Sequence, residues 1–223
     1  MSNNINAKLD FELPKGFIVF ISGVPGVGKT TISYELLKMF DEFRIVEETD
    51  LIREVLRGYN EYIEDKFKNE PHLLFKEIEI TPSAKFLSYD EAKKQCGHMK
   101  KSFEKIIGRQ KRKGITTIIN GVHIVPEILD GLFDNDNIIY FNLFINDKHS
   151  LFERWKERNP LKYTIQNLSV VFDTNLALSA STQTLSKKTE NIFNDIDITH
   201  LSVGQTKTEI IKCLAKRLQN FQA

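Results

Sequence analysis

The strongest constraint on the fold is a glycine-rich loop that lies between two apolar segments. Residues 17–22 form an apolar run that ends in serine, as expected for a strand buried on both faces of a parallel sheet. Residues 31–40 then place apolar side chains at helical spacing. Between them, residues 23–30 have the sequence Gly-Val-Pro-Gly-Val-Gly-Lys-Thr, which matches the phosphate-loop motif in the strand-to-helix context that this motif requires.

This loop has the chemistry that a polyphosphate needs. Successive backbone amides of a glycine-rich turn donate to phosphate oxygens at the start of a helix, and Gly23 and Gly28 allow the close approach. Lys29 places a positive charge on the β and γ phosphates, and the Thr30 hydroxyl is a ligand for magnesium. We therefore predict ATP and Mg²⁺ as the cofactors, with Thr30 as the metal ligand and Lys29 also as a catalytic residue. The predicted nucleotide contacts are Gly23, Val24, Pro25, Gly26, Val27, Gly28, Lys29, Thr30 and Thr31.

Further strands alternate with helical segments along the chain. Apolar stretches at 43–46, 115–119 and 137–145 are each followed by a helical or turn segment, which favours a parallel sheet. The sequence therefore predicts an α/β fold, a P-loop NTPase three-layer sandwich with a mostly parallel sheet of about five strands. We expect a single P-loop domain over residues 1–223.

Two regions depart from a plain alternation of strand and helix. About seventy residues separate the second and third predicted strands, so a helical insertion is expected there. Its clearest helix spans residues 89–113. Residues 147–188 are polar and helix-prone with a break at Asn159-Pro160, which predicts a lid region with a lid helix. Residues 210–221 return to the helical period.

Composition narrows the class of partner. The chain has 31 Lys and Arg against 30 Asp and Glu, so it lacks the basic excess that is typical of nucleic-acid binding. No apolar run approaches the ~18 residues of a membrane span, and the polar start has no signal-peptide pattern. We expect a cytoplasmic protein that acts on a small-molecule acceptor, with Cys96 and Cys213 as reduced thiols. The oligomeric state stays open.

The candidate acceptor site begins where the second strand ends. Asp50, Arg53 and Arg57 are three and four residues apart, so they project from one side of a helix. A carboxylate there can take the proton of an attacking hydroxyl, and guanidinium groups can hold an acceptor's carboxylate or phosphate. We predict Asp50 as a catalytic and substrate-binding residue, and Arg53 and Arg57 as substrate-binding residues. The alternative is an ordinary helix cap at Asp50 with solvated arginines.

The third strand ends in Asn120-Gly121-Val122-His123. Many enzymes with this loop hold magnesium through water with an acid at that strand tip, but Asn120 has no charge. His123 is a candidate for substrate binding as a donor to an acceptor anion, and a packed imidazole is the open alternative.

Two arginines mark the predicted lid. Arg154 and Arg158 are four residues apart, so one helical face carries both charges. We predict that both are catalytic and stabilise charge on the transferred phosphoryl group, with ordinary Glu-Arg pairing as the alternative. His149 and Arg109 are weaker candidates. The adenine contacts are expected near the lid and residues 199–204.

Several segments together resemble the 2-phosphoglycerate kinases and their relatives among P-loop small-molecule kinases. They are SGVPGVGKTTIS at 22–33, TDLIREVLRGY at 49–59, FLSYDEA at 86–92, INGVHIVPEIL at 119–129 and, more loosely, NDKHSLFERWKER at 146–158. The resemblance implies ATP as donor, magnesium, and a hydroxyl on a small phosphorylated or carboxylated acceptor. It implies roles for Lys29, Thr30, Asp50, Arg53 and His123. One departure is Asn120, where the family pattern has Glu.

The leading functional prediction is transfer of the γ-phosphoryl group of ATP to a small anionic metabolite such as 2-phosphoglycerate. A kinase acting on an antibiotic, a nucleoside or a nucleotide is the alternative within the same fold. From another class, an ATP-binding switch or sensor without efficient transfer stays open because Asn120 is neutral. A polynucleotide kinase is disfavoured by the even charge balance.

Overall fold

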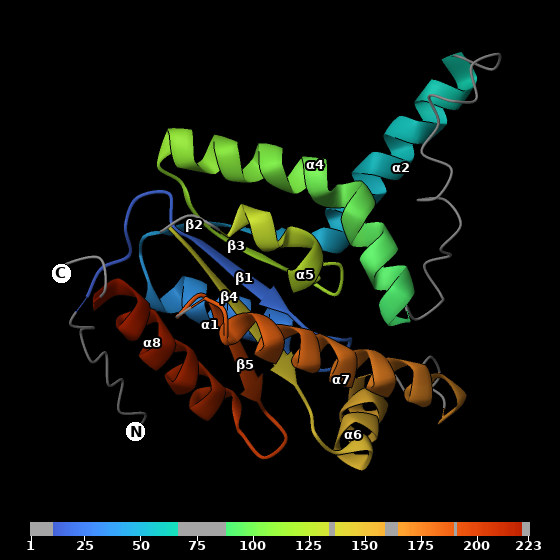
Figure 1. Cartoon of the computed structure of the whole chain (residues 1–223), viewed down its shortest axis with the longest axis vertical. Coiled ribbons are helices and arrows are strands. Elements are labelled where there is room, and N and C mark those ends of the chain that lie inside the picture. The colour runs from blue at the N-terminus through green and yellow to red at the C-terminus, as the bar shows by residue number, and fades with distance from the viewer. Residues whose placement is uncertain (1–10, 67–87, 134–136, 159–164, 190, 220–223) are drawn as a thin grey trace.

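The computed structural model describes residues 11–66, 88–133, 137–158, 165–189 and 191–219 (Figure 1). The strands are β1 (Ile18–Ser22), β2 (Phe43–Glu48), β3 (Thr116–Gly121), β4 (Ile138–Phe144) and β5 (Phe193–Asp197). They pair in parallel in the order β2-β3-β1-β4-β5. The helices are α1 (Lys29–Met39), α2 (Thr49–Lys66), α4 (Tyr89–Lys113), α5 (Pro126–Leu129), the 3-10 helix η2 (Asp130–Leu132), α6 (Lys148–Arg158), α7 (Ile165–Ser186) and α8 (Val203–Gln219).

The helices cover the sheet on both faces. Helices α1 and α8 pack together on one face, and α4, α5 and α7 cover the other (Figure 1). Strand β1 lies in the centre and is fully buried, which explains its apolar sequence. The predicted α/β three-layer sandwich with a parallel sheet of about five strands is confirmed.

Aromatic rings fix the helical layer on the α4 side of the sheet. Phe20 of β1 meets Phe103 of α4 and Phe133 edge-on, with ring centroids 6.3 Å and 5.2 Å apart. Phe133 also contacts Phe193 of β5 at 4.9 Å and Tyr140 of β4 at 5.8 Å. These rings are buried, so they bind strands β1, β4 and β5 to the segment after α5.

The insertion and lid regions contain the expected helices. Helix α4 occupies residues 89–113 as predicted, because Ser88 and Glu91 form a capping box at its start and Gly114 ends it in the left-handed conformation. The region predicted as a lid contains α6 and α7, and α7 packs against β4, β5 and α5. Asn159-Pro160 lies outside the described residues. None of the helices in the described ranges is long and apolar enough to cross a membrane.

Strand β5 and the start of helix α8 differ from the sequence prediction. Strand β5 had no predicted position, because its sequence Phe-Asn-Asp-Ile-Asp mixes polar and apolar residues as an edge strand does. Helix α8 begins at Val203 rather than 210, since its first turn is polar and only Thr206 is buried there. The single domain over residues 1–223 stays a prediction.

The strands bring the predicted site segments to one edge of the sheet. Ser22, the last residue of β1, pairs with Gly121 of β3, and Glu48 of β2 pairs with Asn120. Gly121 lets β3 touch the start of α2, because a Cβ atom at this position would lie 1.7 Å from Thr49 Oγ1. The carboxyl ends of β1, β2 and β3 therefore converge, as expected for a ligand site in an open α/β sheet.

Replacing Gly121 with alanine should destabilise the fold, because the added methyl group would force α2 away from β3. We expect Gly121→Ala to lower the free energy of unfolding by roughly 2–4 kcal/mol. Denaturant unfolding measures the change. Gly97→Ala is the matched control, because a Cβ atom at Gly97 meets nothing within 4 Å and alanine favours helix α4. Equal stability of Gly121→Ala and the wild type would contradict the close contact.

Candidate functional site

The phosphate loop joins β1 to α1 in a conformation that depends on glycine. Gly23, Gly26 and Gly28 have φ angles of 141°, 93° and 83°. A Cβ atom at Gly23 would lie 2.5 Å from the Leu143 carbonyl oxygen, so a side chain is excluded there. Gly28 caps α1 without a side-chain hydrogen bond, which leaves the first amides of the helix to bind an anion.

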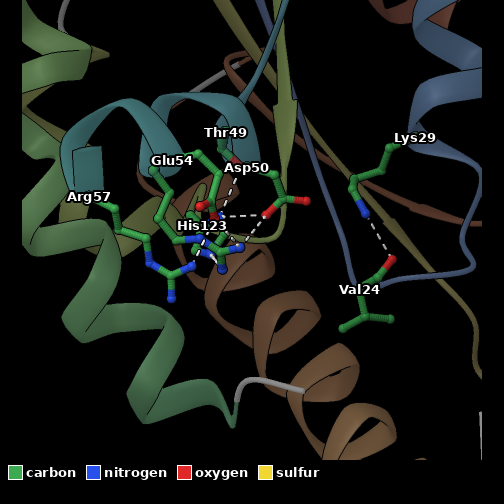
Figure 2. Close-up of polar contacts among 8 residues, drawn as sticks. Val24, Lys29, Thr49, Asp50, Glu54, Arg57 and His123 are labelled. Carbon is green, nitrogen blue, oxygen red and sulfur yellow. Dashed lines mark hydrogen bonds and ion pairs between the residues drawn. The ribbon is translucent and has the colours of Figure 1, made fainter. Parts of the chain in front are cut away.

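Lys29 and Thr30 stand at the start of α1, next to these amides. The Lys29 ammonium donates to the Val24 carbonyl oxygen at 2.9 Å across the loop (Figure 2). The side chains of Thr30 and Thr31 are exposed. A glycine-rich loop with one ammonium group and one exposed hydroxyl group is suited to bind a polyphosphate that carries magnesium.

Trp155 of α6 holds this loop from the other side, and sequence reasoning did not identify it. Its indole N–H donates to the Pro25 carbonyl oxygen at 2.6 Å, and its side chain is fully buried. A Cβ atom at Gly26 would lie 2.3 Å from the Trp155 ring, so this glycine is needed for the contact. The available signal was that Trp155 is the only tryptophan of the chain and lies four residues after Leu151, on the apolar face of α6.

Arg154 fastens α6 to the segment that follows β5. Its guanidinium donates to the carbonyl oxygens of Ile198 at 2.8 Å and Thr199 at 3.5 Å. The lid and the segment at 199–204 are therefore in contact, although their predicted adenine contacts stay untested. The catalytic role of Arg154 stays a prediction, and the Arg158 side chain lies outside the described residues.

The acceptor candidates gather at the start of α2 (Figure 2). Thr49 is buried under Gly121, whereas the Asp50 side chain is 69% exposed. The Asp50 carboxylate lies 3.6 Å from Arg53 Nη2 and 3.8 Å from His123 Nδ1. The structure thus brings Asp50, Arg53 and His123 together, and the exposed carboxylate of Asp50 is open to a hydroxyl group.

Arg53 and Arg57 reach the same carboxylate, that of Glu54. Glu54 Oε1 lies 3.3 Å from Arg53 Nη2 and 2.9 Å from Arg57 Nη1 (Figure 2). The two arginine side chains are only 12% and 17% exposed, whereas Glu54 is 51% exposed. Both guanidinium groups therefore point to one position, which the Glu54 carboxylate occupies. Sequence reasoning missed Glu54, although it lies between the two arginines.

His123 is fully buried behind this group and has two polar neighbours. Its Nδ1 lies 3.0 Å from Thr49 Oγ1, and its Nε2 lies 3.3 Å from Arg53 Nη1. Burial lowers the pKa of His123 to about 4, with Arg53, Lys29 and Arg57 acting in the same direction and Asp50 against them. The imidazole is therefore neutral near pH 7.

Asn120, near the end of β3, contacts α1. Its Nδ2 donates to Ser33 Oγ at 3.1 Å, and Ser33 donates to the Lys29 carbonyl oxygen at 2.9 Å. Within the described ranges, no group of three or more His, Cys, Asp and Glu residues is arranged to hold a metal ion. The role of the Thr30 hydroxyl as a magnesium ligand stays a prediction.

The weaker candidates contribute less to this arrangement. His149 is exposed at the start of α6. Arg109 donates to Gln110 at 3.0 Å, about one turn before α4 ends at Lys113. That end of α4 leads into the amino end of β3, at the edge of the sheet away from the phosphate loop.

The buried His123 should make stability depend on pH. Its pKa is about 4 in the folded protein and near 6.5 when unfolded, so the unfolded chain binds the proton first as the pH falls. We expect proton binding to His123 in the unfolded chain to lower the free energy of unfolding of the wild type as the pH falls from 6.5 to 4. The loss should reach about 3 kcal/mol near pH 4 and should be absent above pH 6.5. Unfolding of the wild type and His123→Gln across pH 4.5–7.5 measures the difference, because the other titrating groups are common to both. Parallel stability curves would contradict a neutral buried imidazole.

The comparisons with known proteins agree with this geometry. No protein-family model matches the chain. The 2-phosphoglycerate kinase of Methanococcus maripaludis (strain C5) is 24% identical in an alignment of length 231 that covers 92% of this chain and 66% of that protein. The 2-phosphoglycerate kinase of Thermococcus kodakarensis is 30% identical over 114 residues, covering 50% of this chain and 38% of that protein.

The chain thus spans slightly less than two thirds of the first of these relatives, at 66% of its length. Among solved structures, a gluconokinase from Sinorhizobium meliloti 1021 superposes with a TM-score of 0.53 at 14% identity, covering 93% of this chain and 97% of that one. The predicted resemblance is confirmed: the chain has a P-loop kinase fold and is similar in sequence to 2-phosphoglycerate kinases over most of its length.

Proposed function

We propose that this protein is a phosphotransferase that moves the γ-phosphoryl group of ATP to a hydroxyl group of a small anionic metabolite. The observation that carries the proposal is that the phosphate loop and the arginines that could bind an anionic acceptor, Arg53 and Arg57, lie at the same edge of the sheet. Ser22, at the end of β1 where the loop begins, pairs with Gly121 of β3, and His123 two residues later contacts Arg53 and Asp50. A nucleotide on the loop and an anion at the arginines would then face each other at one edge of the sheet.

On the donor side, the loop amides and the amides of the first turn of α1 bind the phosphate oxygens. Lys29 moves its ammonium from the Val24 carbonyl oxygen to the β and γ phosphates, where the charge is greater. Thr30 would hold the magnesium ion, which supplies positive charge to the phosphate oxygens. Arg154 and Arg158 of the lid are proposed to stabilise the charge on the transferred group.

On the acceptor side, Arg53 and Arg57 bind the anionic group of the substrate and orient its hydroxyl. Asp50 accepts the hydroxyl proton while the hydroxyl oxygen bonds to the γ phosphorus and the bond from that phosphorus to the β-γ bridging oxygen breaks. ADP leaves with the electrons of that bond. The exposure of Asp50 suits this role, because its carboxylate reaches solvent where the acceptor must enter.

The acceptor that these side chains favour is 2-phosphoglycerate or a compound like it. The curated relatives are named 2-phosphoglycerate kinases. That compound has a carboxylate, a phosphate and one hydroxyl group, and two guanidinium groups match its two anionic groups. A neutral antibiotic or nucleoside would have no anionic group for these two arginines to bind.

A nucleotide-dependent sensor is the second candidate, and Asn120 is the observation that favours it. An amide at the tip of β3 cannot hold magnesium-bound water as a carboxylate does. The sensor would bind ATP at the same loop without efficient transfer. Tight ATP binding with no acceptor-dependent turnover distinguishes the sensor from the kinase.

Removing the Lys29 ammonium should abolish phosphoryl transfer. We expect Lys29→Ala to lower kcat/KM at least about 100-fold, because the charge that stabilises the β and γ phosphates is lost. ADP release in the presence of 2-phosphoglycerate and a panel of phosphorylated and carboxylated compounds gives the rate. Lys101→Ala, an exposed change on α4, is the control.

The fluorescence of Trp155 gives an independent measure of ATP binding, because its indole contacts the loop. Emission should change on addition of magnesium and ATP, with weaker binding in Lys29→Ala. Absence of turnover with every acceptor would refute the kinase and leave the sensor. Full activity of Lys29→Ala would refute the loop assignment.

Glu54 should compete with the acceptor for the two arginines. We expect Glu54→Gln to lower the KM for the acceptor about 2–5-fold, because an exposed ion pair holds its partners by at most about 1 kcal/mol. Initial rates at varied acceptor and saturating ATP measure the effect. Glu61→Gln, an exposed change two turns further along α2, is the control and should leave the KM unchanged. A raised KM in Glu54→Gln would show that Glu54 helps to bind the acceptor instead.

A further inference from the structure

His123 is a buried imidazole whose two ring nitrogens both have partners. No part of its side chain is exposed, and it lies between Thr49 at the start of α2 and Arg53 one turn later. Gly121 keeps this space narrow, since even a methyl group there would overlap Thr49. The ring is therefore held from β3 against the first turn of α2.

The directions of these two hydrogen bonds follow from the partners. A guanidinium group donates and cannot accept, so Nε2 of His123 must accept from Arg53 Nη1. A neutral imidazole with an unprotonated Nε2 has its proton on Nδ1. That proton is donated to Thr49 Oγ1, 3.0 Å away. The bonds run in sequence from Arg53 through His123 to Thr49.

We propose that His123 is a positioning residue, which acts as a neutral hydrogen-bond acceptor that fixes Arg53 for an anionic acceptor and does not touch the substrate. This inference rests on the proposed function. It differs from the interpretation of His123 as a donor to the acceptor anion, because its one N–H group is used by Thr49 and its ring has no exposed surface.

Arg53 needs such an anchor because its other partners, Asp50 and Glu54, are exposed. Asp50 and Glu54, at 3.6 Å and 3.3 Å from Nη2, are 69% and 51% exposed, so both contacts exchange readily with solvent. His123 contacts the other terminal nitrogen, Nη1, from the buried side. A long side chain loses rotamer entropy when it is fixed. The buried hydrogen bond between His123 and Arg53 offsets that loss before the substrate binds.

The Nε donor of Arg53 supports the same orientation. Its Nε is buried and has no hydrogen-bond partner within the described part of the chain. An unsatisfied buried donor on a charged group is unfavourable, so the side chain would rotate away if its far end were not held. His123 thus keeps the guanidinium in place, while Nη2 faces the exposed carboxylate of Glu54, which an anionic acceptor would displace.

Two polar substitutions separate positioning from packing. His123→Gln places an amide oxygen near the position of Nε2 and can still accept from Arg53, whereas the shorter His123→Asn reaches only the position of Nδ1. We expect His123→Asn to raise the KM for 2-phosphoglycerate about 10-fold or more with little change in the KM for ATP, and His123→Gln to stay within about 3-fold of the wild type.

A double-mutant cycle tests whether His123 acts through Arg53. After Arg53→Ala, the change His123→Asn should add no more than about 2-fold to the KM for 2-phosphoglycerate. If the increases in KM caused by Arg53→Ala and His123→Asn multiplied in the double variant, the proposal would be overturned. Equal effects of His123→Gln and His123→Asn would also overturn it. A rise in the KM for ATP that matches the rise for the acceptor would also overturn it, because general damage to the site affects both substrates.

A measurement without turnover keeps this inference separate from the proposed function. Nitrogen NMR of the histidine rings, with His123 identified among the five histidines by its loss in His123→Gln, should show a protonated Nδ1 and an unprotonated Nε2 from pH 6 to pH 8. Arg53→Ala should move the Nε2 signal. The opposite tautomer, or an Nε2 signal unaffected by Arg53→Ala, would overturn the proposal even if the enzyme transfers phosphate. If no acceptor is turned over but the NMR result is as expected, the proposed function fails while the Arg53-His123 bond stands.

Discussion

The contact between Gly121 and Thr49 is the constraint on which the site depends. Parallel strands end at one edge of a sheet, but ending there does not make their side chains meet. In this protein a missing side chain at the end of β3 allows the first turn of α2 to lie against the strand. Asp50 and Arg53 lie at the start of the same helix. The Gly121-Thr49 contact therefore fixes their distances from His123, although it includes neither residue.

A second glycine contact has the corresponding effect on the donor side. Gly26 leaves room for the Trp155 ring, and the indole then binds the Pro25 carbonyl oxygen. The phosphate loop is therefore held between α1, which it starts, and α6, which packs on it. Because Arg154 also joins α6 to the segment after β5, a displacement of α6 would change the loop and that segment together.

Short-range sequence patterns predicted the position of the loop between β1 and α1 and the location of Asp50, Arg53 and Arg57 on one helix. The loop motif needs only eight consecutive residues, and the spacing of Asp50, Arg53 and Arg57 needs only the helical period. Contacts between distant segments were not predictable in the same way, since Trp155 and Pro25 are 130 residues apart and Arg154 and Ile198 are 44 apart. Glu54 was missed for another reason: an acid between two arginines resembles ordinary helix pairing until the geometry shows both cations on one oxygen. Strand β5 was missed because its alternating polar residues give a weak strand signal.

The neutral residue at the tip of β3 follows from its partner on α1. The hydroxyl proton of Ser33 is donated to the Lys29 carbonyl oxygen, so the group that faces Ser33 Oγ from β3 must be a donor. The amide of Asn120 has such a donor, whereas an ionised carboxylate would place a second acceptor against an oxygen with no proton left to give. Asn120 therefore joins the central sheet to the backbone of Lys29 in a way that a carboxylate cannot. The consequence is an attachment of α1 to β3 one turn after Lys29.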